Sequence, residues 1–344
     1  MVSSFKITFI GTGGSWPVPG RAMPCIVLQS DDVTNLLDCG EGSQKRIMES
    51  KISFMQIDNI FLTHFHGDHF LGIIGLIQSM SFNGREKPLH IYGPIMARNI
   101  LQNALSVGYY TLSFDIFVHE LLPDQVVQFD DFKVRTLKND HPVPALSYSF
   151  EENDLVKIDR KKVDSLNIPD RRIEEIRDKG FAEIEGKVIT LDMIAAGLKK
   201  GRKVVYSGDT RPMESMKTFA YGADVLIHET TTDSQYEPKV NEFGHTSSRQ
   251  AALIASDAKV KRFYLFHYSP RIPDPKDLLV EAKGIFKDSY LSREFLEYDV
   301  PKRTDLMQLG SATSHLWTYN GKKHITKCTE CRLLYTFVHL GFVL

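Results

Sequence analysis

Three histidines and one aspartate fall within six consecutive residues, His64-Phe-His-Gly-Asp-His69. Alternate side chains of an extended segment point the same way, so His64 and His66 face one side. A turn at the glycine would bring Asp68 and His69 towards a second point close by. Imidazole and carboxylate groups packed this closely are costly to bury without a cation. The segment therefore predicts a metal site with ligands for two ions.

Six residues cannot fill two coordination shells, so other histidines and aspartates at strand ends are the next candidates. His141, Asp209 and His267 each follow a short apolar run that is predicted to be a strand. The predicted ligands are His64, His66 and His141 for one ion, Asp68, His69 and His267 for the other, and Asp209 as a bridge between them. A set without thiolates favours zinc, with manganese, iron or cobalt as the usual substitutes.

Short strands and turns must position these side chains. The N-terminal part predicts strands over 5–10, 25–29, 35–38, 59–63 and 89–92, and helices over 43–48 and 71–81. Further strands are predicted over 133–137, 203–207, 223–227 and 262–266. The turn Gly11-Thr-Gly-Gly14 resembles a dinucleotide-binding fingerprint, but Trp16 replaces its last glycine and prolines follow, which favours a tight turn.

Composition narrows the class of protein. The 344 residues include 42 Lys and Arg against 43 Asp and Glu, and 42% are apolar, which excludes a disordered or fibrous chain. No run approaches the roughly 20 apolar residues that span a bilayer, and no signal peptide is apparent at the N-terminus. With only four cysteines, the composition predicts a cytoplasmic protein in a reducing compartment.

Charged residues are concentrated in one segment. Eight basic and six acidic residues lie between Lys157 and Lys179, within a stretch of different character over 151–203. One interpretation is a solvated helical insertion. The other is a segment that binds RNA. Near-neutral overall charge means that a nucleic acid would have to be gripped locally rather than by a generally basic surface.

A set of motifs resembles the metallo-β-lactamase superfamily, and within it the short form of the ribonuclease Z family, over roughly residues 5–301. The motifs are the histidine segment at 64–69, Gly11–Gly14, Asp38-Cys-Gly-Glu-Gly-Ser43, His141, Ser207-Gly-Asp-Thr210, His228-Glu229 and Gly244-His-Thr-Ser247. The resemblance implies an α/β fold, a four-layer αβ/βα sandwich with an inserted protruding arm. It also implies a cytoplasmic homodimer with two zinc ions per subunit that removes the 3′ trailer from precursor tRNA.

The resemblance also implies roles for individual residues. Asp68 would accept a proton from the metal-bridging water, and the resulting hydroxide would attack the phosphate. His245 would donate a proton or a hydrogen bond to the leaving 3′-oxygen, and Glu229 would orient its imidazole. The products would be a 3′-hydroxyl on the tRNA and a 5′-phosphate on the trailer. The arm, assigned to residues 151–200, would hold the tRNA. In a dimer, the arm of one subunit could serve the active site of the other.

Two parts of the chain depart from the family's pattern. Its first loop commonly reads Pro-x-Lys-x-Arg-Asn, whereas this chain keeps Pro17 and Arg21 but has no lysine or asparagine there. The catalytic domain is predicted to be 1–301, followed by an extension, 302–344, beyond the point where the family usually ends. Within the extension, Cys328 and Cys331 with His324 and His339 form a weak candidate for a third zinc site.

Two alternative functions are compatible with the same residues. A hydrolase of small molecules, such as a phosphodiesterase, arylsulfatase or thioesterase, would use the same dinuclear zinc site but would leave the arm without a purpose. A non-catalytic RNA-binding relative is disfavoured because all of the expected metal ligands are present.

Overall fold

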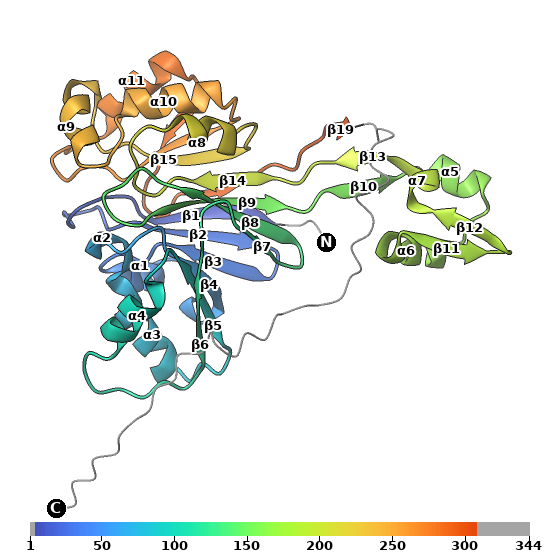
Figure 1. Cartoon of the computed structure of the whole chain (residues 1–344), viewed down its shortest axis with the longest axis horizontal. Helices are drawn as coiled ribbons and strands as arrows, with labels where there is room; N and C mark the ends of the chain where they lie inside the picture. The colour runs from blue at the N-terminus through green and yellow to red at the C-terminus, as the bar shows by residue number, and fades with distance from the viewer. Residues whose placement is uncertain (1–3, 308–344) are drawn as a thin grey trace, which may run out of the picture.

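The computed structural model describes residues 4–307. Two seven-stranded sheets pack face to face, and helices cover the outer face of each (Figure 1). The four-layer α/β sandwich predicted from the sequence is therefore confirmed. The four residues of the candidate third zinc site, Cys328, Cys331, His324 and His339, lie outside the described residues.

The first sheet has the strand order β18-β1-β2-β3-β4-β5-β6. Strands β3 to β6 run parallel, so their C-terminal ends meet at one edge. Its strands are β1 (Phe5–Gly11), β2 (Cys25–Ser30), β3 (Val33–Leu37), β4 (Ile57–Phe61), β5 (Leu89–Gly93), β6 (Ile116–Glu120) and β18 (Glu297–Asp299).

The second sheet has the order β17-β16-β15-β14-β9-β8-β7, and its strands β14 to β17 are parallel. These strands are apolar almost throughout because both faces of the sheet are covered. Its members are β7 (Val126–Gln128), β8 (Phe132–Lys138), β9 (Leu146–Glu152), β14 (Lys203–Tyr206), β15 (Val225–Glu229), β16 (Phe263–Phe266) and β17 (Ser289–Leu291).

Helices form the two outer layers (Figure 1). The first sheet is covered by α1 (Ser43–Glu49), α3 (Gly72–Phe82) and α4 (Ala97–Leu105), and the second by α8 (Glu214–Phe219), α10 (Ser248–Asp257) and α11 (Lys276–Ile285). Short elements complete the body: α2 (Gly67–Phe70), α9 (Glu237–Glu242), and the 3-10 turns at Phe54–Gln56 and Ser234–Tyr236. No helix among the described residues is long and apolar enough to cross a membrane.

Three apolar cores hold these layers together. Aromatic residues such as Phe61, Tyr148 and Phe150 fill the space between the sheets, with ring centroids of Phe61 and Phe150 5.0 Å apart. A second core lies between the first sheet and its helices, and a third between the second sheet and its helices. Each sheet is thereby buried on both faces, which fixes the positions of the strand ends.

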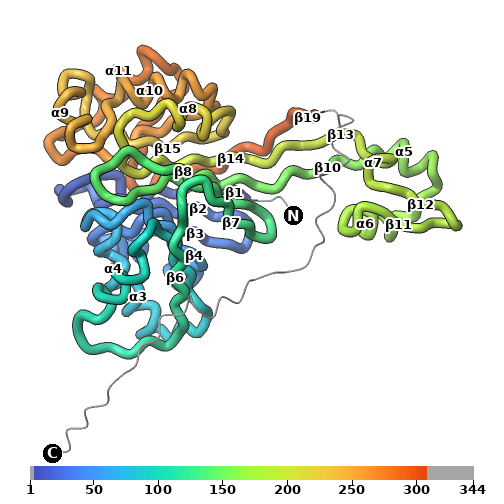
Figure 2. Tube along the Cα trace, in the orientation of Figure 1, coloured from blue at the N-terminus to red at the C-terminus, as the bar shows by residue number. Residues whose placement is uncertain are grey.

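An arm protrudes from the body on a narrow stalk (Figures 1 and 2). The stalk is the antiparallel pair β10 (Leu155–Ile158) and β13 (Ala195–Lys199), and β19 (Leu306–Met307) pairs with β13. The distal part contains α5 (Arg160–Ser165), α6 (Asp170–Lys179), α7 (Leu191–Ile194) and the hairpin of β11 (Phe181–Ile184) and β12 (Lys187–Thr190). It has a small apolar core of its own, which includes Val163, Ile173 and Ile176.

Two details differ from the sequence prediction. The insertion is not simply helical, since strands make up its stalk and a hairpin lies in its distal part. The strand predicted to end at Ile227 continues through His228 and Glu229, because β15 is paired on one side with β16 as far as Glu229, opposite Phe266. Glu229 is therefore held on a rigid strand rather than on a loop.

Candidate metal centre

Loops at the ends of four strands bring the seven predicted ligands together. The segment after β4 carries His64, His66, Asp68 and His69, and the loops after β8, β14 and β16 carry His141, Asp209 and His267. Within the segment after β4, the predicted turn is the short helix α2, with His66 at its N-cap position. The two sheets therefore contribute ligands from opposite sides of one site.

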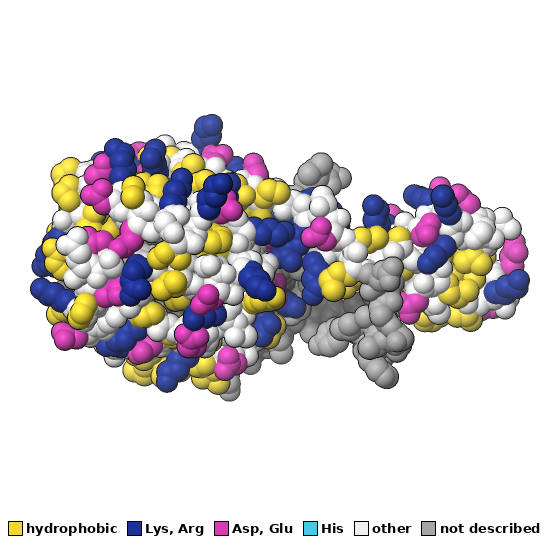
Figure 3. Space-filling model, turned by 90° about the horizontal axis from the view of Figure 1, so that it is seen from above, with side chains coloured by type: hydrophobic (Ala, Val, Ile, Leu, Met, Phe, Trp, Pro, Cys, Tyr) yellow, Lys and Arg dark blue, Asp and Glu magenta, His cyan; other side chains and the backbone are white. Residues whose placement is uncertain are grey.

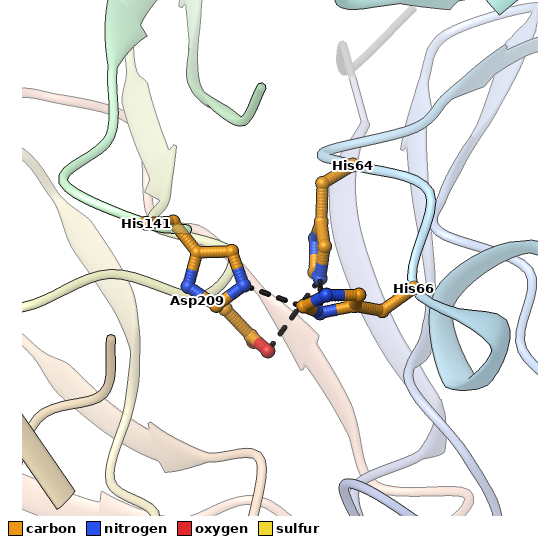
Figure 4. A group of neighbouring side chains, drawn as sticks. All are labelled: His64, His66, His141 and Asp209. Carbon is orange, nitrogen blue, oxygen red and sulfur yellow. Dashed lines mark hydrogen bonds and ion pairs between the residues drawn. The ribbon is translucent and has the colours of Figure 1, made fainter. Parts of the chain in front are cut away.

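The first group consists of His64, His66, His141 and Asp209 (Figure 4). Nδ1 of His66 lies 3.1 Å from Nε2 of His64 and 3.2 Å from Nε2 of His141. Oδ2 of Asp209 lies 3.7 Å from Nε2 of His64. These distances bring four potential ligand atoms around one point.

The second group consists of Asp68, His69 and His267, and Asp209 adjoins it. Oδ2 of Asp68 lies 3.7 Å from Nε2 of His69 and 3.4 Å from Nε2 of His267. Oδ1 of Asp209 lies 3.3 Å and 3.4 Å from the same two nitrogens. Asp209 therefore directs one carboxylate oxygen to each group, in the arrangement expected of a bridge.

Four of the five imidazoles are anchored through the nitrogen that points away from the cluster. Nδ1 of His141 donates to the carbonyl oxygen of Gly244 at 2.9 Å. Nδ1 of His64 lies 3.0 Å from Thr63 Oγ1, and Nδ1 of His69 lies 2.8 Å from Asp38 Oδ2. Nδ1 of His267 lies 3.3 Å from Thr231 Oγ1. Such contacts fix ring orientation and tautomer in metal sites. They leave Nε2 directed into the cluster.

Three buried atoms in the cluster have no hydrogen-bond partner among the described residues: Nε2 of His69, Nε2 of His267 and Oδ1 of Asp209. Buried polar atoms are rarely left unsatisfied, because each one forfeits its hydration. Here the three converge on each other, and a cation would satisfy all of them at once. The residues therefore fit a metal ion, and the cluster is capable of binding one.

Burial and neighbouring charges favour the ligand forms of three histidines and of Asp68. Burial lowers the pKa of His64, His66 and His141, which keeps the imidazoles neutral. Burial raises the pKa of Asp68, but the neighbouring His69 and His267 lower it by more, so that this group stays a carboxylate. At His69, burial lowers the pKa, but the carboxylates of Asp209 and Asp38 raise it by more. Neutral imidazoles and ionised carboxylates are the forms that coordinate metals.

His245 and Glu229 lie at the rim of the cluster. Nδ1 of His245 is 3.1 Å from Oε1 of Glu229 and 3.8 Å from Oδ2 of Asp209. The main-chain N–H of Thr210 donates to Glu229 Oε1 at 2.9 Å, and Thr231 Oγ1 donates to Oε2 at 2.6 Å. Burial lowers the pKa of His245, but the Glu229 carboxylate raises it by more, to about 9.

A buried network around Asp38 supports the second group. Asp38 is fully buried and accepts hydrogen bonds from the main-chain N–H and hydroxyl of Thr63 and from the Tyr206 hydroxyl, the last at 2.7 Å. Its Oδ2 also faces Nδ1 of His69. Sequence reasoning noted Asp38 only as part of a motif and gave it no role. Its place directly after β3 was the available signal.

Comparison with known proteins gives the family. A family model described as Anti-Pycsar protein Apyc1 matches residues 5–285 of this chain, so the chain falls within the group of proteins that this model describes. Ribonuclease Z from Thermoplasma acidophilum is 59% identical over 306 residues, which cover 89% of this chain and 100% of that protein. The chain belongs to the ribonuclease Z family.

Solved structures agree with this assignment. The short form of human tRNase Z is 25% identical, with a TM-score of 0.63, over 86% of this chain and 99% of that one. YhfI from Bacillus subtilis, a metallo-β-lactamase fold protein, is 22% identical with a TM-score of 0.63 and covers 86% and 99% of the two chains. The fold predicted from the motifs is thereby confirmed as the metallo-β-lactamase type.

The loop that departs from the ribonuclease Z pattern keeps Arg21 for a structural reason. Its guanidinium donates to the carbonyl oxygens of Ser269, Ile272 and Pro273 at 3.2, 3.0 and 3.2 Å. These residues belong to the loop that follows His267. Arg21 therefore fixes the loop after a predicted ligand against the loop after β1.

Replacing Asp38 by asparagine is expected to weaken metal binding. The amide keeps the size of the side chain but removes the charge that holds His69 Nδ1–H. Loss of such a partner typically costs about 10–100-fold in metal affinity or activity. Competition with a chromophoric chelator would measure the affinity. Asp58→Asn is the control. The Asp58 carboxylate accepts a hydrogen bond from the main-chain N–H of Thr34 at 2.9 Å and is not part of the cluster. Equal affinities of Asp38→Asn and the wild type would contradict the role.

Proposed function

We propose that the chain is a zinc-dependent endoribonuclease that cuts the 3′ trailer from precursor tRNA and leaves a 3′-hydroxyl on the tRNA and a 5′-phosphate on the trailer. As a member of the ribonuclease Z family, the protein is a metal-dependent phosphodiester hydrolase. The observation that carries the proposal is the pair of ligand groups that share Asp209, because two adjacent ions suit phosphodiester hydrolysis.

Two zinc ions per subunit are proposed, with manganese, iron and cobalt as substitutes. The first would be held by His64, His66 and His141 and the second by Asp68, His69 and His267, with Asp209 shared. Imidazole and carboxylate ligands without thiolates favour this metal class. When bound, such ions lower the pKa of water and neutralise charge on the phosphate.

Asp68 is proposed as the proton acceptor. Its Oδ2 faces His69 and His267 and accepts a hydrogen bond from the main-chain N–H of Ser15 at 2.6 Å. The side chain is still 11% exposed, whereas His69 is fully buried. Asp68 can therefore take a proton from the attacking water and pass it to solvent.

His245 is proposed as the proton donor to the leaving 3′-oxygen. Its Nδ1 is engaged by Glu229, and its side chain is 17% exposed, which leaves Nε2 for the substrate. Glu229 is fixed by Thr210 and Thr231 and so holds the imidazole in one orientation. Glu229 is a positioning residue, because it acts through His245.

The arm is proposed to bind the body of the tRNA. Residues 155–199 hold ten basic and nine acidic residues, so net charge alone does not favour RNA. Figure 3 shows the Lys and Arg side chains on the arm and its stalk interleaved with acidic ones. At the base of the arm, however, a pocket of about 480 Å³ is lined by apolar side chains such as Ile158 and Ile173 and by four basic ones, Lys157, Arg160, Arg177 and Lys199, and none of its described lining residues is acidic. This pocket is suited to phosphates.

A homodimer and a cytoplasmic location are parts of the same proposal. Both come from the family resemblance, and precursor tRNA as the substrate is consistent with the cytoplasm. A dimer would allow the arm of one subunit to hold a tRNA in the active site of the other.

Cleavage of a 3′-extended precursor tRNA by the zinc-loaded protein tests the proposal. We expect His245→Ala to lower kcat by about 10²–10⁴-fold, the usual contribution of general acid–base catalysis. Glu229→Gln should have a smaller effect of about 10–100-fold. Mapping the 3′ and 5′ ends of the products identifies the bond that is cut.

His90→Ala is the matched control, because His90 lies on β5 and contacts His119 at 3.1 Å rather than the cluster. Activity of the wild type on bis(p-nitrophenyl) phosphate without any cleavage of the tRNA would refute the proposal. That outcome would favour the alternative, a hydrolase of small phosphodiesters.

A further inference from the structure

An exposed tryptophan lies in a loop whose main chain contacts the cluster of predicted metal ligands. Trp16 is 47% exposed, in the loop after β1. Its neighbour Ser15 donates its main-chain N–H to Oδ2 of Asp68 at 2.6 Å. Two residues before Trp16, a Cβ added to Gly14 would come within 2.3–2.6 Å of three atoms of the His267 ring. The main chain of this loop is therefore in contact with two predicted ligands.

The loop is held rigidly at both of its ends. Ser15 has a positive φ of 70°, which is unusual for a residue with a side chain and which its bond to Asp68 stabilises. The Trp16 N–H donates to the carbonyl oxygen of Gly14 at 2.9 Å. Further along, Arg21 binds the loop after His267. Trp16 is thus presented on a fixed support.

A cation lies against the same ring. The guanidinium carbon of Arg271 is 5.4 Å from the Trp16 ring centroid, within the range of a cation–π contact. Arg271 is also exposed, and it belongs to the loop that Arg21 fixes. The pair combines an aromatic face with a cation, which are the two groups that bind nucleobases and phosphates of single-stranded RNA.

We propose that Trp16 and Arg271 form a stacking platform for a nucleobase next to the cleaved phosphodiester. The inference rests on the proposed function, because it assigns a further substrate contact to that site. An indole face stacks on any base, so the platform positions the strand with little sequence preference. Trp16 lies in the loop in which this chain has neither the lysine nor the asparagine of the family's pattern.

Kinetics on precursor tRNA test this role. Trp16→Ala is expected to lower kcat/KM about tenfold, equivalent to about 1.4 kcal/mol, whereas Trp16→Phe should stay within about threefold of the wild type because it keeps a stacking face. Hydrolysis of bis(p-nitrophenyl) phosphate, which offers no nucleobase, should not change. Tyr221→Ala is the matched control, since Tyr221 is 59% exposed and also has a cation, Lys259, 5.9 Å from its ring centroid.

Substrates that lack one base locate the contact. One precursor lacks the base on the 5′ side of the cleaved bond and another lacks the base on the 3′ side. On the substrate that lacks the stacked base, Trp16→Ala should cause no further loss. An intact precursor that is cut equally well by Trp16→Ala and the wild type would overturn the inference. An equal loss on all three substrates would do the same.

Binding gives a readout that does not depend on cleavage of tRNA. Trp16 and Trp317 are the two tryptophans of the chain, so in a Trp317→Phe variant the fluorescence reports Trp16 alone. A pentaadenylate should quench this fluorescence, and an abasic pentamer should not. If the wild type fails to cut precursor tRNA, the proposed function is wrong. Quenching by pentaadenylate would then still support the stacking platform, and its absence would overturn it.

Discussion

Asp209→Ala is expected to remove both metal binding and activity. Its two carboxylate oxygens face different groups, Oδ2 towards His64 and Oδ1 towards His69 and His267. Alanine would leave these imidazoles close together without the negative charge between them. Because a bound metal supplies several kcal/mol of charge stabilisation in the transition state, we expect turnover to fall by more than about 10³-fold. Elemental analysis of the purified protein and phosphodiesterase assays would measure the two effects.

Asp140→Asn is the matched control for this substitution. Asp140 precedes His141 at the same edge of the sheet, but its side chain is 58% exposed and pairs with Arg211 at 2.8 Å. An exposed ion pair of this kind contributes little to stability. We expect wild-type metal content and activity from Asp140→Asn. Retention of two ions per subunit by Asp209→Ala would contradict the role of Asp209 as a bridge.

Removal of the distal part of the arm is expected to impair cleavage of tRNA but not hydrolysis of a small phosphodiester. Ile158 and Ala195 are partners across the stalk, so residues 159–194 can be replaced by an Asn-Gly turn that closes the strand pair. The apolar core of the arm is separate from the three cores of the body, which should therefore remain folded. Cleavage of precursor tRNA should fall by about 100-fold or more as phosphate contacts are lost, with hydrolysis of bis(p-nitrophenyl) phosphate within about twofold of the wild type.

Mixing two variants that are each impaired in tRNA cleavage tests whether the arm acts across a dimer. The shortened protein has an intact centre, and Asp209→Ala has an intact arm. If the arm of one subunit serves the other, mixed dimers should recover part of the tRNA cleavage. Light scattering would establish the oligomeric state of each variant. Full tRNA cleavage by the shortened protein alone would show that the arm does not bind the substrate.

Local patterns predicted most of the body and the candidate ligands. Short apolar runs followed by His or Asp mark strand ends, and parallel strands place those ends at one edge. The prediction for His64–His69 needed only six residues, and those for His141, Asp209 and His267 needed only the strand before each. The structure brings all seven together in the predicted groups. Their roles as ligands remain a proposal.

Features that depend on distant contacts were not predictable in the same way. The Asp38 network joins residues from three strand ends, and nothing near Asp38 in the sequence points to Tyr206. The helices of the arm lie largely within the charge-dense segment 157–179 from which the insertion was predicted, whereas its strands lie at or beyond the ends of that segment and were not predicted. The contact between the loop of Trp16 and the cluster depends on Ser15 and Asp68, which lie 53 residues apart in the chain.

Because the predicted ligands come from both sheets, binding of a metal ion would be coupled to folding. His69 and His267 come from opposite halves of the sandwich, and 198 positions separate them in the chain. A bound ion would therefore act as a cross-link that closes very long loops, much as a disulfide restricts the unfolded chain. Because neither half carries a complete ligand set, the ion would bind only after the halves have docked, and it would then resist their separation.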